Sequence, residues 1–165
     1  MRKIFLILTS LVVLSSCGFR PLYGNTNTLA GSTTSLDQIM LEDMPGATGL
    51  NMKNALIDRF YHHGYPENPL YALRVNLQES GRSIVIEKND TTTRTQLVMS
   101  ATYDLIDRRT RKSVDHGTIR AVSSFNNLPS QYTTIATQSD AREMTIRELA
   151  DKLTLRMGVV LEQQP

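Results

Sequence analysis

The sequence has few of the residues on which disulfide-rich folds and metal sites depend. Cys17 is the single cysteine among 165 residues, so no internal disulfide can form, and three histidines leave little for a zinc site of the Cys/His type. Tryptophan is absent. An excess of one charge is lacking as well, since 18 Lys and Arg face 16 Asp and Glu, which gives no reason to expect nucleic acid as a partner. With 40% hydrophobic and 21% charged residues, the composition is that of one ordinary globular domain.

A long hydrophobic run is also lacking, but a short one opens the chain. Arg2 and Lys3 precede eleven mostly apolar residues, 4–14. As a helix this run would measure about 16 Å, roughly half of the apolar core of a bilayer, so it is too short to span a membrane. Positive charge followed by a short apolar run is typical of a secretory signal peptide.

The end of that run predicts lipidation. Leu14-Ser15-Ser16-Cys17 matches the bacterial lipobox, in which an aliphatic and two small residues precede the cysteine that becomes the new N-terminus. Cys17 is therefore predicted to carry an S-diacylglycerol and an N-acyl chain, and two or more chains anchor a protein stably. The alternative is an ordinary signal peptide with a chance cysteine at the cleavage site. Gly18 replaces the aspartate that usually retains such proteins in the inner membrane, which favours the outer membrane.

Three segments follow from this interpretation. Residues 1–16 are predicted to be the signal peptide, residues 17–35 a lipidated N-terminus and a Gly-, Asn-, Thr- and Ser-rich tether, and residues 36–163 one domain. Loss of Arg2 and Lys3 would leave 16 basic and 16 acidic side chains. The mature chain is then formally neutral.

Hydrophobic periodicity predicts strands and helices in the order strand, helix, three strands, helix. The strands are expected at residues 36–41, 71–78, 97–105 and 114–125, with residues 83–86 extending or re-entering the second. The charged turn 107–112 implies an antiparallel hairpin. The expected fold class is α+β, with two helices packed on one face of a roughly four-stranded, largely antiparallel sheet.

The two helices have recognisable apolar stripes. The first is expected to start at Asn51, with Gly64 as the residue after its end. The second is expected to start near Thr137 or Ser139, after a loop over residues 126–137. Its predicted buried stripe consists of Ile146, Leu149, Ala150, Leu153, Met157, Val160 and Leu161.

No catalytic constellation is recognisable. His62 and His63 would point about 100° apart on a helix, so they do not easily share a metal, and Asp115 and His116 would face opposite sides of a strand. The sequence contains no nucleophile elbow, phosphate-binding loop or His-Glu-Xaa-Xaa-His motif. We therefore expect no enzyme, no metal and no cofactor, and a lipid-anchored hydrolase is the least favoured function.

Basic residues gather on the predicted hairpin. Several would meet at one tip, where Arg side chains are well matched to phosphate or carboxylate groups. An equally good interpretation is a solvated tip kept charged to prevent edge-to-edge pairing. The residues concerned are Arg94, Arg108, Arg109, Arg111, Lys112 and Arg120.

One stretch resembles a known family. Cys17-Gly18-Phe19-Arg20-Pro21-Leu22-Tyr23-Gly24 is similar to the opening of mature LPS-assembly lipoproteins, the LptE family, especially its alphaproteobacterial branch. The likeness continues through residues 51–60 and the closing helix around residues 141–153. Residues 25–35 and 80–95 show no family motif.

The resemblance implies a non-enzymatic partner of the outer-membrane β-barrel LptD. In that family the lipoprotein plugs the barrel lumen from the periplasmic face, and the pair inserts lipopolysaccharide into the outer leaflet. The six basic residues then become candidate contacts to lipid A phosphates, which is our own hypothesis. The main alternative is an accessory lipoprotein of a periplasmic phospholipid transport system.

Overall fold

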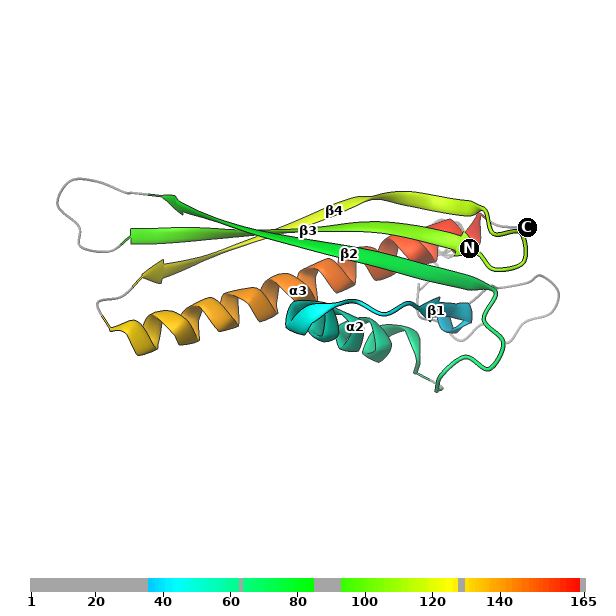
Figure 1. The fold of residues 1–165 in the computed structure, drawn as a ribbon, viewed down its shortest axis with the longest axis horizontal. Helices are drawn as coiled ribbons and strands as arrows, with labels where there is room; N and C mark the ends of the chain where they lie inside the picture. The colour runs from blue at the N-terminus through cyan, green and yellow to red at the C-terminus, as the bar shows by residue number, and fades with distance from the viewer. Residues whose placement is uncertain (1–35, 63, 85–92, 128–129, 164–165) are drawn as a thin grey trace, which may run out of the picture. The chain divides into compact units, whose positions relative to one another are not determined.

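Two helices lie on one face of a four-stranded sheet in a computed structural model, which describes residues 36–62, 64–84, 93–127 and 130–163 (Figure 1). The predicted α+β class and the two-helix, four-strand arrangement are confirmed. The two α-helices are α2 (Gly46–Phe60) and α3 (Gln131–Glu162), and a short 3-10 helix, η2 (Leu36–Gln38), precedes the first strand. The strands are β1 (Ile39–Leu41), β2 (Tyr71–Ile84), β3 (Thr93–Asp107) and β4 (Ser113–Asn127).

The described residues all belong to the second of two units into which the chain divides, residues 32–165. The predicted signal peptide, the lipidation site Cys17 and the tether lie outside them. The boundaries at 1–16, 17–35 and 36–163 therefore remain predictions. Among the described helices, none is both long and apolar enough to cross a membrane.

The strand order in the sheet is the same as the order along the chain, β1-β2-β3-β4. β2, β3 and β4 pair antiparallel, so the predicted hairpin is confirmed. β1 pairs parallel to the start of β2, because α2 lies between the two strands and carries the chain back to the end at which β1 began. β2 extends without interruption to Ile84, as one of the two sequence interpretations expected.

Alternation along the long strands gives the sheet two different faces. Leu73 and Met99 are fully buried on the face that the helices cover, while Asn76 and Thr102 are exposed on the other face. The helix-covered face therefore supplies the core, and the opposite face of the sheet is open in the described part of the chain.

The helix α2 begins earlier than the sequence predicted. It starts at Gly46 after an extended Pro45, not at Asn51, because its first turn lacks the apolar spacing that marks the rest. The predicted stripe of Met52, Leu56 and Phe60 is buried as expected. The helix ends at Phe60, so Gly64 is not the residue directly after it; Gly64 instead takes a φ of 104° in the following turn.

The helix α3 also begins earlier, at Gln131, rather than near Thr137 or Ser139. Its first turns carry polar threonines whose hydroxyls bond to carbonyls of the same helix, and no apolar stripe marks them. The later stripe is as predicted: Ile146, Leu149, Ala150, Leu153, Met157, Val160 and Leu161 are all buried.

Candidate functional site: the basic turn and the neighbouring pocket

The turn between β3 and β4 carries four of the six candidate basic residues and is organised by Asp107. The Asp107 carboxylate accepts hydrogen bonds from the backbone N–H groups of Arg109 and Thr110 at 2.7 and 2.8 Å. These bonds, the one from Thr110 foremost, lower the pKa of Asp107. Arg111 closes the turn with a φ of 56°, in the left-handed region. The turn is thus fixed by its backbone, and its side chains remain available.

Arg108 differs from the other basic residues of the turn because it holds the segment before β2. Its backbone N–H donates to Leu70 O at 3.0 Å, and its Nη1 donates to Pro69 O at 2.8 Å. Arg109, Arg111 and Lys112 are exposed, and none of them forms a salt bridge within the described residues. These three side chains form the part of the turn that is free to bind a ligand.

The other two candidates do not join the turn. Arg94 pairs with Asn126 near the opposite end of the hairpin, thirteen residues before Asp107, which is roughly 40 Å away at about 3.3 Å per residue. Arg120 pairs with Ser100 in the middle of β4. Both arginines are exposed and lie on the open face of the sheet. The six residues are therefore two groups, the turn and the open face.

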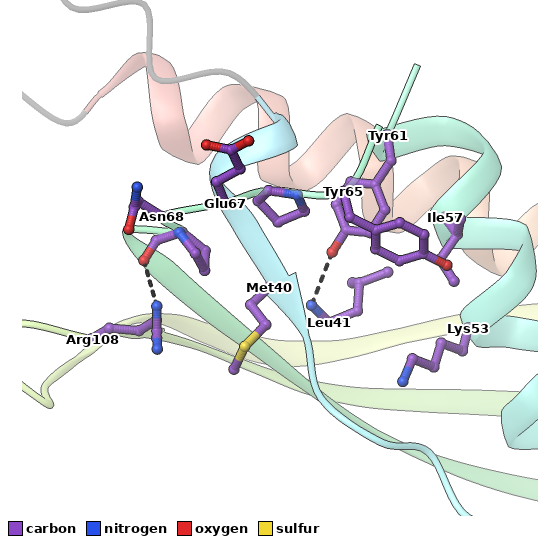
Figure 2. Close-up of a pocket in the computed structure, with 11 residues that line it drawn as sticks. Met40, Leu41, Lys53, Ile57, Tyr61, Tyr65, Glu67, Asn68 and Arg108 are labelled. Carbon is purple, nitrogen blue, oxygen red and sulfur yellow. Dashed lines mark hydrogen bonds between the residues drawn. The ribbon is translucent and has the colours of Figure 1, made fainter. Parts of the chain in front are cut away.

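A pocket of about 430 Å³ adjoins the turn (Figure 2). Apolar and aromatic side chains make up most of its lining, with Tyr61 and Tyr65 packed at 5.1 Å between ring centroids. Lys53 and Arg108 contribute positive charge, although Lys53 is already paired with Asp43 at 2.6 Å. Glu67 and Asn68 also line the pocket, so it offers both apolar and polar surface beside the exposed cations, as an anionic amphiphile would need.

Tyr61 closes one side of this pocket and one edge of the sheet. Its hydroxyl donates to Ile39 O at 2.8 Å and accepts from Leu41 N–H at 3.2 Å. Both backbone groups belong to β1 and point away from β2, so the hydroxyl takes the place of a neighbouring strand. Burial raises the pKa of Tyr61, which keeps the hydroxyl protonated and able to donate.

A second polar cluster ties α3 to the hairpin close to the turn. Asp115 accepts from Arg156 Nε and Nη2 at 2.9 and 2.7 Å and from the Tyr103 hydroxyl at 2.9 Å. The paired guanidinium is the main reason that the pKa of Asp115 is lowered, and burial is the main reason that the pKa of Tyr103 is raised. A Cβ at Gly117 would lie 3.0 Å from the Tyr103 hydroxyl, so this position favours glycine. The cluster fastens α3 to β3 and β4.

The histidines stay apart from this cluster. His116 is exposed and pairs across the strands with Asp104, while its neighbour Asp115 binds Arg156 on the helix side. His62 is exposed after α2, and His63 lies outside the described residues. Residues 36–62, 64–84, 93–127 and 130–163 contain no group of three or more His, Cys, Asp or Glu side chains that could hold a metal ion.

Sequence reasoning did not identify the pocket or the Asp115–Tyr103–Arg156 cluster. Its members come from segments far apart in the chain, and neither set has a fixed spacing. The one available signal was the density of aromatic residues at 60–65, directly before the prolines at 66 and 69.

Comparisons with known proteins agree with the fold. A family model described as LptE: Lipopolysaccharide-assembly matches residues 27–157. A solved structure from Caulobacter crescentus, named as a lipoprotein, is 22% identical with a TM-score of 0.63, covering 80% of this chain and 96% of that chain. A minor lipoprotein from Acinetobacter baumannii is 20% identical with a TM-score of 0.58, covering 76% and 93%. The rare lipoprotein B from Shewanella oneidensis is 9% identical with a TM-score of 0.56, covering 73% and 92%.

A comparison with curated proteins gave no match. At these identities the solved structures show a shared fold and no more. The family model covers most of the chain, from the predicted tether into the last helix. This chain therefore belongs to the LptE family of lipopolysaccharide-assembly proteins.

Proposed function

We propose that the chain is an outer-membrane lipoprotein that plugs the LptD β-barrel and helps it to assemble, so that the pair inserts lipopolysaccharide into the outer leaflet. The family match over residues 27–157 carries this proposal. An anchor at Cys17 would hold the domain at the periplasmic face and raise its effective concentration beside the barrel. The chain's own contribution is non-enzymatic.

The open face of the sheet supports the plug role. Its centre carries hydroxyl and amide side chains, and Thr102 and Thr118 lie 3.2 Å apart across two strands. Asn76 and Gln78 continue this surface on β2. The wall of a water-filled barrel lumen is polar and wet, so it can hydrogen-bond to these side chains while Arg94 and Arg120 on the same face stay in contact with water.

Purification in mild detergent tests the partner. We expect the full-length chain, solubilised from its own outer membranes, to bring down a β-barrel of several hundred residues identified by mass spectrometry. A Cys17→Ser variant, which removes the lipidation site and leaves the domain unchanged, should be lost from the membrane fraction. Recovery of phospholipid-transport proteins without a barrel would contradict the proposal and favour the alternative.

We further propose that the turn contacts lipid A phosphates through Arg109, Arg111 and Lys112. These three side chains are exposed and form no salt bridge among the described residues, so binding a phosphate breaks no ion pair. Guanidinium groups match phosphate oxygens in geometry as well as charge. The apolar side chains of the adjoining pocket, among them Met40 and Ile57, provide a surface for the lipid part of the same molecule.

Charge-reversal variants test whether lipopolysaccharide binds to the turn or to the open face. Replacing Arg109, Arg111 and Lys112 by Glu should weaken lipopolysaccharide binding at least tenfold at low salt, and the difference should shrink as salt rises. Barrel co-purification should stay unchanged. The matched control is the pair Arg94→Glu and Arg120→Glu, which changes charge far from the turn; a loss confined to this pair would place the contact on the open face. Binding that is unchanged at every salt concentration in the turn variant would reject the turn.

A further inference from the structure

The outer edge of β4 has free backbone hydrogen-bonding groups. β4 is the last strand of the sheet, and Lys152 Nζ reaches Arg120 O from α3 at 2.8 Å, which shows that this carbonyl points outward. Backbone groups of an antiparallel strand alternate in direction, so Val122 and Ser124 present their N–H and C=O groups on the same side. No backbone partner for these groups occurs in the described part of the chain.

A groove of about 840 Å³ adjoins this edge and is lined by β4 and by α3 residues between Thr137 and Asp151. Consecutive residues from Val122 to Asn126 line it, so it follows the edge itself rather than one face of the sheet. Two of its apolar side chains are left in solvent: Met144 is 61% exposed and Val122 is 47% exposed. Phe125 adds a partly buried ring. Apolar exposure and unpaired backbone therefore coincide.

The stretch of this edge along the groove lacks several common protections. Natural edge strands carry charged residues, above all lysine, or proline, or are twisted away by a bulge or covered by a helix or loop. Lys152 of α3 covers the Arg120 carbonyl, but the residues from Val122 to Asn126 include no charged side chain. β4 contains neither Lys nor Pro, and its irregularity lies at the other end of the strand, opposite Leu105 and Ile106. β2 also has no strand neighbour beyond Leu73 on its outer side, but its residues line neither of the two cavities described. The groove thus distinguishes β4 from the other open stretch.

The charges of the groove indicate what it can bind. Its lining includes the carboxylates of Asp140, Glu148 and Asp151, against one arginine. Glu148 and Asp151 are already paired with Lys152 and Arg59, but Asp140 has no ion pair within the residues that the structure describes. A ligand with a basic side chain next to an apolar one could form an ion pair with Asp140 and pack its apolar side chain on Met144.

We propose that β4 accepts a fifth strand, namely an extended segment of a partner protein that pairs with the edge around Val122 and Ser124. Every second side chain of that segment points into the groove, because side chains of a strand alternate between faces. Those side chains are apolar against Met144 and Phe125, and basic against Asp140. The inference goes beyond the plug role and does not depend on it, since backbone pairing recognises a strand rather than one particular protein.

Photo-crosslinking across the groove tests this inference in intact cells. The full-length chain carries p-benzoylphenylalanine in place of Met144, and the crosslinked peptides are sequenced. We expect one extended segment of another protein, with apolar and basic residues two apart. Ser124→Pro removes an outward N–H and should lower the yield at least tenfold, whereas His116→Pro, on the same edge outside the groove, should leave it within twofold.

A charge variant keeps the test decisive if Ser124→Pro perturbs the strand. Asp140→Lys on the exposed surface of α3 should lower the yield severalfold, while Glu162→Lys near the end of the same helix, outside the groove, should not. Crosslinks to a second copy of this chain, to lipid only or to nothing would overturn the inference. So would a yield that neither Ser124→Pro nor Asp140→Lys changes.

Discussion

The two outer strands of the sheet differ in whether their outward backbone groups are hydrogen-bonded. At β1, the Tyr61 hydroxyl bonds to two outward backbone groups, Ile39 C=O at 2.8 Å and Leu41 N–H at 3.2 Å, so a side chain closes the middle of that edge. At β4, α3 supports the strand from below: Ser123 Oγ donates to Ala141 O at 3.0 Å, and Thr145 Oγ1 lies 2.8 Å from Ser123 Oγ. The outward backbone groups of Val122 and Ser124 remain open.

This difference shows how an edge can be stable and still available. Three residues of β1 are too short to hold themselves in a sheet, so they depend on a helix-end tyrosine. The fifteen residues of β4 are held along their length by β3 and fastened at several points to α3. A well-supported strand keeps its shape while one side stays unpaired, and a marginal strand does not.

The largest effect is expected where α3 supports the β4 side of the sheet. Leu149 is fully buried in α3, so Leu149→Ala should lower the free energy of unfolding by about 2–5 kcal/mol, from lost burial and the cavity left behind. Leu155→Ala on the same helix is the control, because Leu155 is 55% exposed and should cost less than about 0.5 kcal/mol. Denaturant unfolding measures both; similar losses would mean that α3 is not packed as described.

The next effect concerns the closed edge. Tyr61→Phe removes the hydroxyl and leaves Ile39 C=O and Leu41 N–H without a partner, which should destabilise the domain by about 1–3 kcal/mol. Hydrogen exchange at the Leu41 amide should accelerate at the same time. Tyr65→Phe serves as the control because that ring is 72% exposed. An unchanged Leu41 amide in Tyr61→Phe would show that the hydroxyl does not close the edge.

A smaller effect is expected from the cluster that fastens α3 beside the start of β4. Because the pKa of Asp115 is lowered in the folded state, its contribution to stability is present above the unfolded pKa of about 3.9 and is lost as pH falls through the folded pKa. Asp115→Asn should cost about 1 kcal/mol at neutral pH, a value kept low because Arg156 is half exposed.

The pH dependence of stability distinguishes the loss of the Asp115–Arg156 ion pair from a nonspecific destabilisation of the domain. As the pH falls below about 4, the melting temperature of the wild type should drop more steeply than that of Asp115→Asn, so the two curves converge in acid. Asp140→Asn, at an exposed carboxylate without an ion pair among the described residues, should follow the wild type. Parallel curves for wild type and Asp115→Asn would contradict the assigned role.

The smallest effect lies in the turn that leads into β4. Arg111 has a φ of 56°, which costs a residue with a Cβ more than it costs glycine, so Arg111→Gly should stabilise the domain by about 0.5–1 kcal/mol. Arg109→Gly should not stabilise it, because Arg109 does not have a positive φ. Denaturant midpoints decide, and a loss of stability in Arg111→Gly would show that its side chain supports the turn.

Sequence periodicity predicted most of the fold and little of the site. The stripe from Ile146 to Leu161 and the alternation around Leu73 and Met99 are local patterns, and the structure buries them as expected. Both helix starts were predicted too late, because the first turns of α2 and α3 contain glycine, threonine and other residues without apolar spacing. The family match over residues 27–157 confirms the predicted family, while the opening stretch 17–24 lies outside both the matched and the described residues.

The sequence predicted the basic turn from Asp107 to Lys112, but it did not predict which of the six basic residues would lie in that turn with free side chains. Only the tertiary structure places Arg108 against Pro69, leaves Arg109, Arg111 and Lys112 without salt bridges among the described residues, and sends Arg94 to the other end of the hairpin. Charge content is local, whereas the partner of each charge depends on what the rest of the chain brings near it.

By itself the sequence determined which residues are apolar and at what period, and this sets the strands, the two helices and the face that each one buries. Only the tertiary structure decided which edge of the sheet is closed and which stays open. An edge is defined by its neighbour in space, and that neighbour is distant in sequence: Tyr61 is 20 residues from the Leu41 N–H whose hydrogen bond it accepts, and Lys152 is 32 residues from the Arg120 carbonyl that it covers.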